Sequence, residues 1–243
     1  MKMLAFAVRG AKEILRDPLN LCFGLGFPLV LILLLSAIQA NIPVPLFEIQ
    51  QLTPGVTVFG LSFMTLFSAV IISKDRTSAF LQRLYTTPLK PMDFILGYTL
   101  PLIPIALGQS IICYAAALVL GLTPTVNILY ALLFIVPVSV FFIALGLLFG
   151  SILNDKAVGG VCGALLTNLS AWLSGIWFDL ELVGGAFKRI AYALPFVHAV
   201  ELERVVLRGD FGSIVEHLIW VLAYTLVCGA LAVVLFLRQM KRQ

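Results

Sequence analysis

Charge is absent from the middle of this chain: no Asp, Glu, Lys or Arg occurs between Phe94 and Asn154. About 20 apolar residues cross the ~30 Å hydrocarbon core of a bilayer as a helix, so this stretch is long enough to cross twice. Gly121, Pro124 and Asn127 interrupt it and mark the turn between the two crossings. A soluble protein has no reason to keep such a length uncharged. We therefore predict a membrane-embedded helical hairpin.

Charge is also scarce elsewhere, since 12% of the residues are charged and 61% are hydrophobic. The mean hydropathy is +1.07. Ordinary transmembrane β-barrels are excluded, because their strands alternate polar and apolar residues, whereas these runs are apolar throughout. The sequence predicts a single all-α membrane domain over residues 1–243. Its six transmembrane helices are expected at 19–40, 54–73, 95–120, 127–151, 157–177 and 217–237.

Several residue patterns that catalysis, metal binding or ATP binding would require are also absent. The four cysteines stand singly in predicted spans, without the paired spacing of disulfide or metal sites. His198 and His217 are too few and too separate for a metal site. No acidic or basic residue lies well inside a predicted span, which disfavours proton- or sodium-coupled transport. No Gly-x-x-x-x-Gly-Lys-Ser/Thr phosphate loop is present. We therefore expect no catalytic residue, no metal and no bound cofactor in this chain, and any ATP must act from another subunit.

Basic residues gather beside alternate predicted spans. Twelve of the 16 fall on one side: Lys2, Arg9, Lys12, Arg16, Lys74, Arg76, Arg83, Lys90, Lys156, Arg238, Lys241 and Arg242. Short loops rich in Lys and Arg stay in the cytoplasm. We therefore predict a multi-pass protein of the cell membrane with both termini cytoplasmic. The same bias accounts for the net charge of +4, so no nucleic-acid partner is implied.

Residues 1–18 read as an amphipathic helix lying on the membrane surface. Leu4, Val8, Ala11 and Leu15 recur at helical spacing on one face, the charged residues occupy the other, and Pro18 ends the helix. A solvated arm is the alternative interpretation.

The segment 75–88, between the second and third predicted spans, carries a second amphipathic pattern. Phe80, Leu81 and Leu84 form an apolar stripe, Arg76 and Arg83 lie off it, and prolines follow. A loop that only reversed the chain could be far shorter. We interpret the segment as a helix that docks onto another protein. An interfacial helix with no partner is the alternative.

Several stretches resemble one known family. Lys74-Asp-Arg76, Leu81-Gln-Arg-Leu84 and Thr87-Pro-Leu89, followed by Asp93-Phe-Ile-Leu-Gly-Tyr98, resemble the cytoplasmic coupling helix of type-2 permeases of ATP-binding-cassette (ABC) exporters. Leu15-Arg-Asp-Pro18, Ser174-Gly-Ile-Trp-Phe178, and Pro195-Phe-Val-His198 with Arg204 are similar to further parts of that family. No single motif is decisive, but their order and spacing cover nearly the whole chain.

The resemblance implies a half-transporter. Two copies, or this chain and a paralogue, would form the translocation path as a homodimer or heterodimer. Each would bind a separate cytoplasmic nucleotide-binding subunit, which would hold ATP and Mg. The coupling-helix residues that would dock that subunit are Arg76, Phe80, Leu81, Arg83 and Leu84.

In that family, helices two and five face the partner across the dimer axis. The resemblance therefore nominates a cargo path lined by Phe59, Phe63, Phe67, Asn168 and Trp172. An aromatic, weakly polar lining suits a small hydrophobic or amphiphilic cargo such as a drug, an antibiotic or a lipid-like molecule. The alternative interpretation is that the phenylalanines face membrane lipid.

The outer segment 179–210 is too long for a plain loop and too charged to span. Gly184-Gly185 and Pro195 divide it into two short helices, on the second of which Glu201 and Arg204 can pair. The resemblance implies external re-entrant helices that cap the exit. It nominates Pro195, His198, Glu201 and Arg204 as an external gate.

The leading functional hypothesis is thus the permease subunit of an ATP-driven exporter. Two alternatives stay open: export of polysaccharide or teichoic-acid precursors, and a non-transporting membrane scaffold that anchors a cytoplasmic partner.

Overall fold

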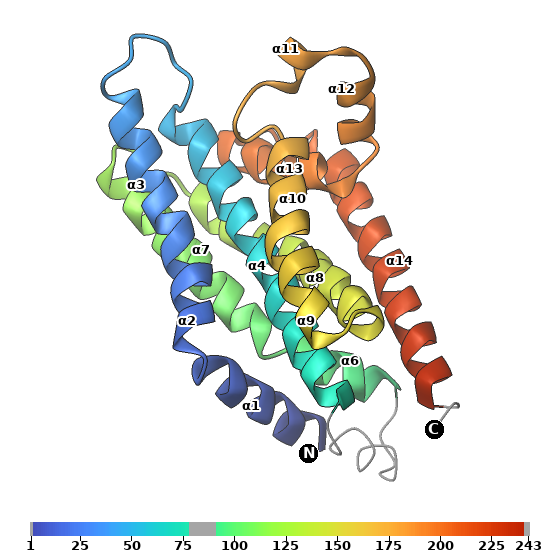
Figure 1. Cartoon of the computed structure of the whole chain (residues 1–243). Helices are drawn as coiled ribbons and strands as arrows, with labels where there is room; N and C mark the ends of the chain where they lie inside the picture. The colour runs from blue at the N-terminus through green and yellow to red at the C-terminus, as the bar shows by residue number, and fades with distance from the viewer. Residues whose placement is uncertain (1, 78–90, 241–243) are drawn as a thin grey trace.

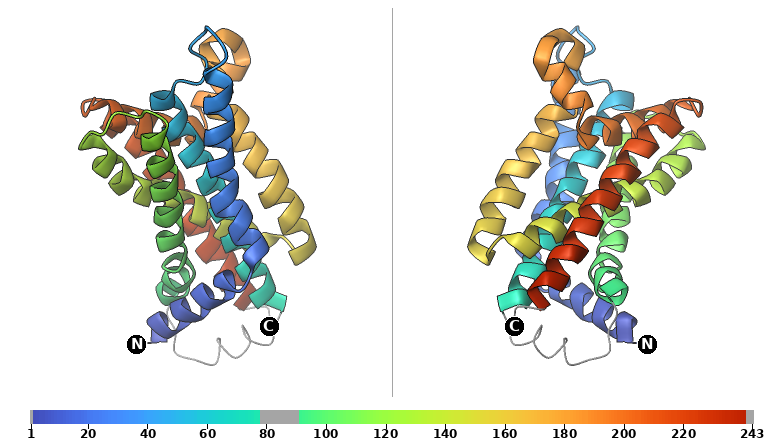
Figure 2. Two further views of the ribbon diagram at one scale, coloured as in Figure 1. Left: turned by 90° about the vertical axis from the view of Figure 1, so that its left-hand side faces the viewer. Right: turned by 90° about the vertical axis from the view of Figure 1, so that its right-hand side faces the viewer.

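The first helix lies across one end of the bundle. The computed structural model describes residues 2–77 and 91–240, and within those ranges every regular element is helical. α1 (Lys2–Leu15) runs across the end from which the other helices rise (Figures 1 and 2). Its Phe6 and Ile14 are buried, whereas Val8 and Leu15 are 48% and 64% exposed. One apolar strip thus packs on the protein and a second remains on the surface, as expected of an interface helix.

The long helix α4 (Ile49–Thr77) occupies the centre of the bundle, where its neighbours bury it almost from end to end. The elements before it are α2 (Pro18–Leu21), the π-helix η1 (Cys22–Gly26) and α3 (Phe27–Gln39). After it come α6 (Pro91–Thr99), α7 (Leu102–Val119), α8 (Asn127–Ile152), α9 (Asp155–Val158), the π-helix η2 (Gly159–Leu166), α10 (Thr167–Leu173), α11 (Leu180–Val183), α12 (Gly185–Tyr192), α13 (Pro195–Arg208) and α14 (Ile214–Met240).

Five helical stretches are long and apolar enough, by length and composition, to cross a membrane. They are Cys22–Gln39, Ile49–Arg76, Ile95–Val119, Asn127–Ile152 and Ile214–Phe236. Each overlaps a predicted span, and the chain is a multi-pass membrane protein. α4 is longer than the predicted 54–73, so residues 75–77 of the predicted coupling helix form its last turn. The remainder of that prediction, 78–88, lies outside the described residues.

The predicted span 157–177 corresponds to three consecutive elements rather than one helix. α9, η2 and α10 follow one another without a gap from Asp155 to Leu173, and η2 and α10 pack along α4. The wide π turns of η2 begin at the pair Gly159-Gly160. α1 and the last turns of α14 lie at the same end of the bundle (Figure 1). The segment is not among the five helical stretches that are long and apolar enough to span a membrane.

The predicted third span is broken where its two prolines stand. α6 ends at Thr99 and α7 begins at Leu102, with Pro101 as its N-cap residue and Pro104 in its first turn. Proline removes a backbone donor and clashes with the preceding turn, which accounts for the break.

The glycines of α8 and those of η2 differ in their packing. A Cβ added at Gly146 or Gly150 of α8 would collide with the backbone of α4, so these two glycines let α8 and α4 approach closely within the subunit. By contrast, a Cβ at Gly159 or Gly160 would meet no neighbouring atom within 4 Å. Gly159 and Gly160 therefore do not serve a close contact within the subunit.

The outer segment forms three helices instead of the two predicted. α11 adds one short turn before Gly184, whose φ of +62° is a conformation that glycine adopts readily. α11 and α12 stand at the end of the bundle opposite α1, and α13 packs beneath them against α4, α8 and α14 (Figure 1).

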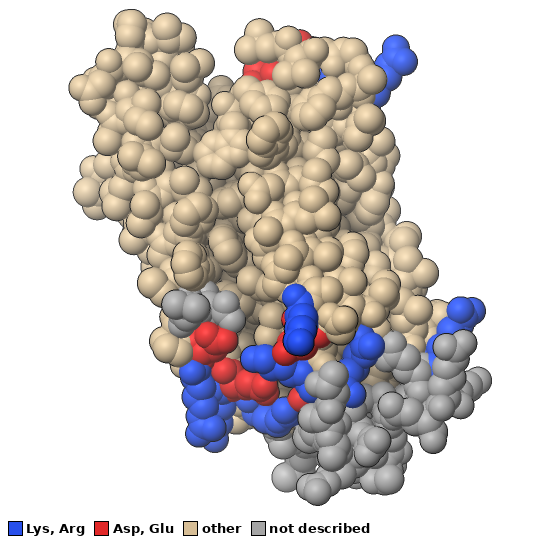
Figure 3. Space-filling view, viewed as in Figure 1, with Lys and Arg blue, Asp and Glu red and all other residues tan. Residues whose placement is uncertain are grey.

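Charged side chains gather at the end of the molecule that carries α1, and a few lie at the opposite end (Figure 3). The broad band between them is uncharged on the face shown. Large apolar side chains are exposed on the outer helices within this band, among them Leu118 of α7, Leu133 of α8 and Leu226 of α14. Such a surface is stable in contact with lipid.

Candidate functional site

The last turn of α4 is joined to three other parts of the chain immediately before the segment that the sequence identifies as the coupling helix. We call the side chains that make these joints the basal cluster: Arg9, Ser73, Asp75, Arg76 and Tyr98. They come from α1, α4 and α6, and they contact the end of α8 and the start of α9.

Asp75 is the centre of this cluster. It is 2% exposed, and its two carboxylate oxygens accept hydrogen bonds of 3.1 and 2.6 Å from the Arg9 guanidinium of α1. The Tyr98 hydroxyl of α6 donates to the same carboxylate at 2.7 Å, and Phe6 packs edge-on against the Tyr98 ring. Asp75 therefore ties α4 to the interface helix and to the start of the next span.

The Arg9 guanidinium is the cationic half of this bond. Partial burial disfavours its charged form, but the hydrogen bond and the charge of Asp75 outweigh that cost and raise the pKa of Arg9 above its ordinary value. A bidentate arginine–carboxylate pair also fixes orientation, because both partners are planar. α1 is thus held at a defined angle to α4.

Arg76 points toward the C-terminal end of α8. Its Nη1 donates to the carbonyls of Gly150 and Leu153 at 2.7 and 3.1 Å. The last carbonyls of a helix lack intrahelical donors and carry partial negative charge, so a guanidinium stabilises them. Ser73 Oγ adds a 3.1 Å hydrogen bond to Asp155 of α9.

The predicted docking residues are only partly described. Arg76 lies in α4 and engages its own chain as above, so its contact with a nucleotide-binding subunit stays a prediction. The other four, Phe80, Leu81, Arg83 and Leu84, lie outside the described residues.

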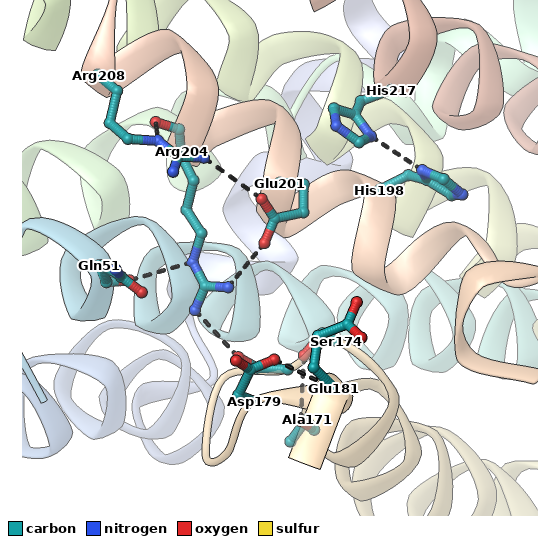
Figure 4. Close-up of polar contacts among 11 residues, drawn as sticks. Gln51, Ala171, Ser174, Asp179, Glu181, His198, Glu201, Arg204, Arg208 and His217 are labelled. Atoms are coloured by element: carbon teal, nitrogen blue, oxygen red, sulfur yellow. Dashed lines mark hydrogen bonds and ion pairs between the residues drawn. The ribbon is translucent and has the colours of Figure 1, made fainter. Parts of the chain in front are cut away.

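At the opposite end, Arg204 of α13 joins three elements (Figure 4). Its Nη1 donates to Glu201 at 2.8 Å, which is the pair expected from the sequence. Its Nη2 donates to the Gly175 carbonyl at 3.0 Å, and Nε to the Gln51 carbonyl at 3.4 Å. Arg204 therefore links α13 to the first turn of α4 and to the turn that follows α10. We call Arg204 and Glu201, with these carbonyls, the outer latch.

A cavity of about 440 Å³ lies beside the outer latch. Phe47, Trp177, Phe178 and Tyr192 contribute aromatic surface, and the latch residues contribute charge. Its lining is mixed in polarity, so it could accommodate an amphiphilic molecule.

The two histidines are in contact, so the expectation that they are too separate is wrong. Their Nδ1 atoms are 3.0 Å apart, and His198 Nε2 is 3.0 Å from the Tyr192 carbonyl. A carbonyl only accepts, so we assign the His198 proton to Nε2 and the shared proton to His217. Burial lowers the pKa of His198. In the described ranges no group of three metal-ligating side chains is found.

Pro195, the remaining predicted gate residue, occupies the first turn of α13 and is buried. Proline is favoured at this position because the donor it lacks would be unsatisfied there anyway.

The three phenylalanines nominated for the cargo path are buried inside the subunit. Phe59, Phe63 and Phe67 are 6%, 8% and 3% exposed. Phe59 packs edge-on against Trp177 and against Phe63. In this arrangement they neither line an open path nor face lipid, because α3, η1 and the 174–178 turn cover them.

The two nominated residues of α10 lie on the surface instead. Trp172 is 57% exposed, and Asn168 is exposed with its amide donating to the Ala164 carbonyl at 2.8 Å. Together with Gly160 and Ala164 they recur every four residues along one exposed face of η2 and α10. This face is available to a second subunit or to lipid.

Sequence reasoning overlooked Arg9 and Tyr98 as partners of Asp75, and it gave no role to Glu203. Helical spacing could have indicated Glu203, because it falls on one face of α13 with Ala199 and Val206, both buried. The contacts of Asp75 join residues 66 and 23 positions apart in the chain, and no local pattern encodes them.

The described residues form a multi-pass helical bundle with an amphipathic helix across one end and a short helical cap at the other. The family model described as ABC-2 type transporter matches residues 1–207. The chain belongs to that family, and it is the transmembrane permease component of an ABC transporter, not the ATPase. No curated protein and no solved structure matches it.

Proposed function

We propose that this chain is the permease half of an ATP-driven exporter that moves hydrophobic or amphiphilic cargo out of the cell. It works as a dimer with separate nucleotide-binding subunits, which bind ATP and Mg and dock at segment 75–88. Both termini and this segment face the cytoplasm.

One observation carries the proposal: the basal cluster joins the root of the docking segment to α1, α6 and the end of α8. A push on segment 78–88 by a closing pair of nucleotide-binding subunits enters the chain at Thr77. From there Asp75 passes the displacement to α1 and α6, and Arg76 passes it to α8. A loop that served only as a connection would not need these buried bonds.

The membrane orientation rests on six passes and on charge. An even number of passes places both termini on one side, and the excess of Lys and Arg on that side identifies the cytoplasm. The predicted membrane is the plasma or inner membrane.

The second subunit fits the exposed face of η2 and α10. Small residues at 160 and 164 let two helices approach closely, and Asn168 can hydrogen bond across such a contact. In a homodimer this face would meet its own copy, and the path would open when α3 and α4 separate to uncover the buried phenylalanines. The outer latch then acts as the external gate.

These surfaces support the proposed cargo class. The covered phenylalanines on α4 and the mixed lining of the outer cavity suit a small amphiphile better than a long hydrophilic polymer. Nothing observed favours export of polysaccharide or teichoic-acid precursors.

Co-purification with a nucleotide-binding subunit tests the proposal. The double substitution Phe80→Asp and Leu84→Asp removes the apolar stripe of the docking helix, so association should fall at least tenfold while the permease stays in the membrane. Leu182→Asp is the control, because Leu182 is 83% exposed at the other end of the molecule.

ATP hydrolysis by the complex should rise when hydrophobic amphiphiles are titrated. Association that survives both aspartates would refute docking at this segment. A complex whose hydrolysis ignores every amphiphile would favour the scaffold function instead.

A further inference from the structure

α13 carries a buried acidic residue that none of the roles above uses. Glu203 is 0% exposed, and neither of its carboxylate oxygens has a hydrogen-bond partner of good geometry. Its neighbours on the same face, Val200 and Val206, are also 0% exposed. An acidic side chain in such a place is unusual, because charged residues are rarely buried without a partner.

No cation compensates Glu203 in the described part of the chain. The adjacent Arg204 turns to Glu201 and to the Gly175 carbonyl. The side chain that interacts with Glu203 is Tyr114 of α7, whose hydroxyl is buried and also lacks a well-formed hydrogen bond. A hydroxyl can donate to or accept from a carboxylic acid, but it cannot neutralise a carboxylate.

We propose that Glu203, with Tyr114 beside it, is a proton-binding site that is occupied while α13 is packed and is emptied when α13 lifts away. Removing an ion from water without a counter-charge costs far more than burying a neutral acid. Glu203 therefore keeps its proton in the packed state. Once α13 separates from α4 and α8, and from Tyr114 of α7, water reaches the carboxyl and the proton leaves.

The sign of the pH effect follows directly. Burial raises the pKa of Glu203 well above its ordinary value of 4.5, and Tyr114 opposes this only in part. Protonated Glu203 thus stabilises the packed state fully when the pH is below its ordinary pKa. This stabilisation is lost as the pH rises toward its raised pKa. Between the two values, each pH unit should increase the lifted fraction of α13 about tenfold, since one proton is released.

Other titrating groups on this side are accounted for. Tyr114 faces Glu203 from α7. On α13 and α14, His198 interacts with His217, Glu216 and Glu201, and its lowered pKa keeps it neutral above pH ~7. Comparison with a Glu203→Gln variant at each pH therefore separates the contribution of Glu203 from that of these groups.

Infrared difference spectroscopy of the purified chain tests proton occupancy. The spectrum of the natural protein minus that of Glu203→Gln at pH 7.5 should contain the C=O stretching band of a protonated carboxylic acid. Glu48→Gln, which alters an exposed carboxyl of the outer loop, is the control and should give no such band. If Glu203 also gives only the ionised signature, the proposal is overturned. Where Glu203→Gln does not fold, Tyr114→Phe retains the acid and should shift its band.

Thiol labelling tests whether proton loss from Glu203 is coupled to the movement of α13. A thiol introduced at the buried Val200 should react faster with a maleimide as the pH rises. The Val200→Cys, Glu203→Gln double variant carries the same thiol without the acid. Dividing the first rate by the rate of this variant cancels the pH dependence of the labelling reaction itself. The ratio should grow about tenfold per pH unit, and a constant ratio would overturn the linkage. Neither measurement needs ATP or cargo, so failure of the exporter proposal would leave both results interpretable.

Discussion

Asp75 shows how strongly the contacts at the α1 end of the bundle depend on one carboxylate. It is buried and accepts hydrogen bonds from α1 and α6, whereas its partner Arg9 keeps about a third of its side chain in solvent. Such pairs are asymmetric: loss of the buried anion removes the charged acceptor that Arg9 and Tyr98 share, while loss of an exposed contact changes little.

Asp75→Asn should therefore lower the free energy of unfolding by about 1–3 kcal/mol, the cost of unsatisfied buried partners discounted for the exposure of Arg9. Thermal unfolding of the detergent-purified protein measures it. Glu13→Gln is the matched control, because Glu13 meets the same arginine at 3.2 Å on the helix surface. Its cost should stay near ~0.3–0.5 kcal/mol. Equal effects of the two substitutions would remove Asp75 from the centre of the cluster.

At the scale of elements, close packing of α8 on α4 depends on the two α8 glycines. Gly146 lies where a Cβ would overlap Ser68 Oγ and the Thr65 backbone. Thr65 and Ser68 in turn donate to the carbonyls of Phe142 and Ile143 on α8, at 2.9 and 3.2 Å. The contact therefore combines missing side chains with hydrogen bonds between the helices.

Gly146→Ala should destabilise the protein by about 1–3 kcal/mol, the usual cost of overpacking. Gly108→Ala in α7 is the control, since a Cβ there meets nothing within 4 Å, and alanine is the better helix former. Its midpoint of thermal unfolding should stay level or rise. A neutral Gly146→Ala would show that α4 and α8 can move apart freely.

The elements also show what the sequence could predict. Hydropathy located five of the six predicted spans, and proline accounts for the break before α7, because both effects are local. The π-helix η2 and the burial of Phe59, Phe63 and Phe67 were not predictable in this way, since they depend on which helices pack against α4. Proximity of His198 and His217 depends likewise on the angle between α13 and α14.

For the whole molecule, the distribution of charge and the proposed even number of passes predict an orientation. The charged end with α1 and the docking segment should face the cytoplasm, and the turn around Pro124 should face outward.

Single thiols at positions 78 and 124, in a background without the native cysteines, should react with a membrane-impermeant maleimide from opposite sides of the membrane. In intact cells only the Pro124→Cys variant should be labelled, and Ser78→Cys should react once the membrane is opened. Reaction of both variants from the same side would contradict the six-pass topology.

α4 is bonded to other elements at both of its ends. Near its start the Gln51 carbonyl is held by Arg204 of α13, and near its finish Asp75 and Arg76 are held by α1, α6 and α8. The helix between these anchors is uninterrupted and about 36 Å long at 1.5 Å per residue. An axial shift of a few ångströms imposed at Thr77 would therefore strain the Arg204–Gln51 bond on the far side of the bilayer. As one rigid helix, α4 would transmit a displacement from one membrane surface to the other.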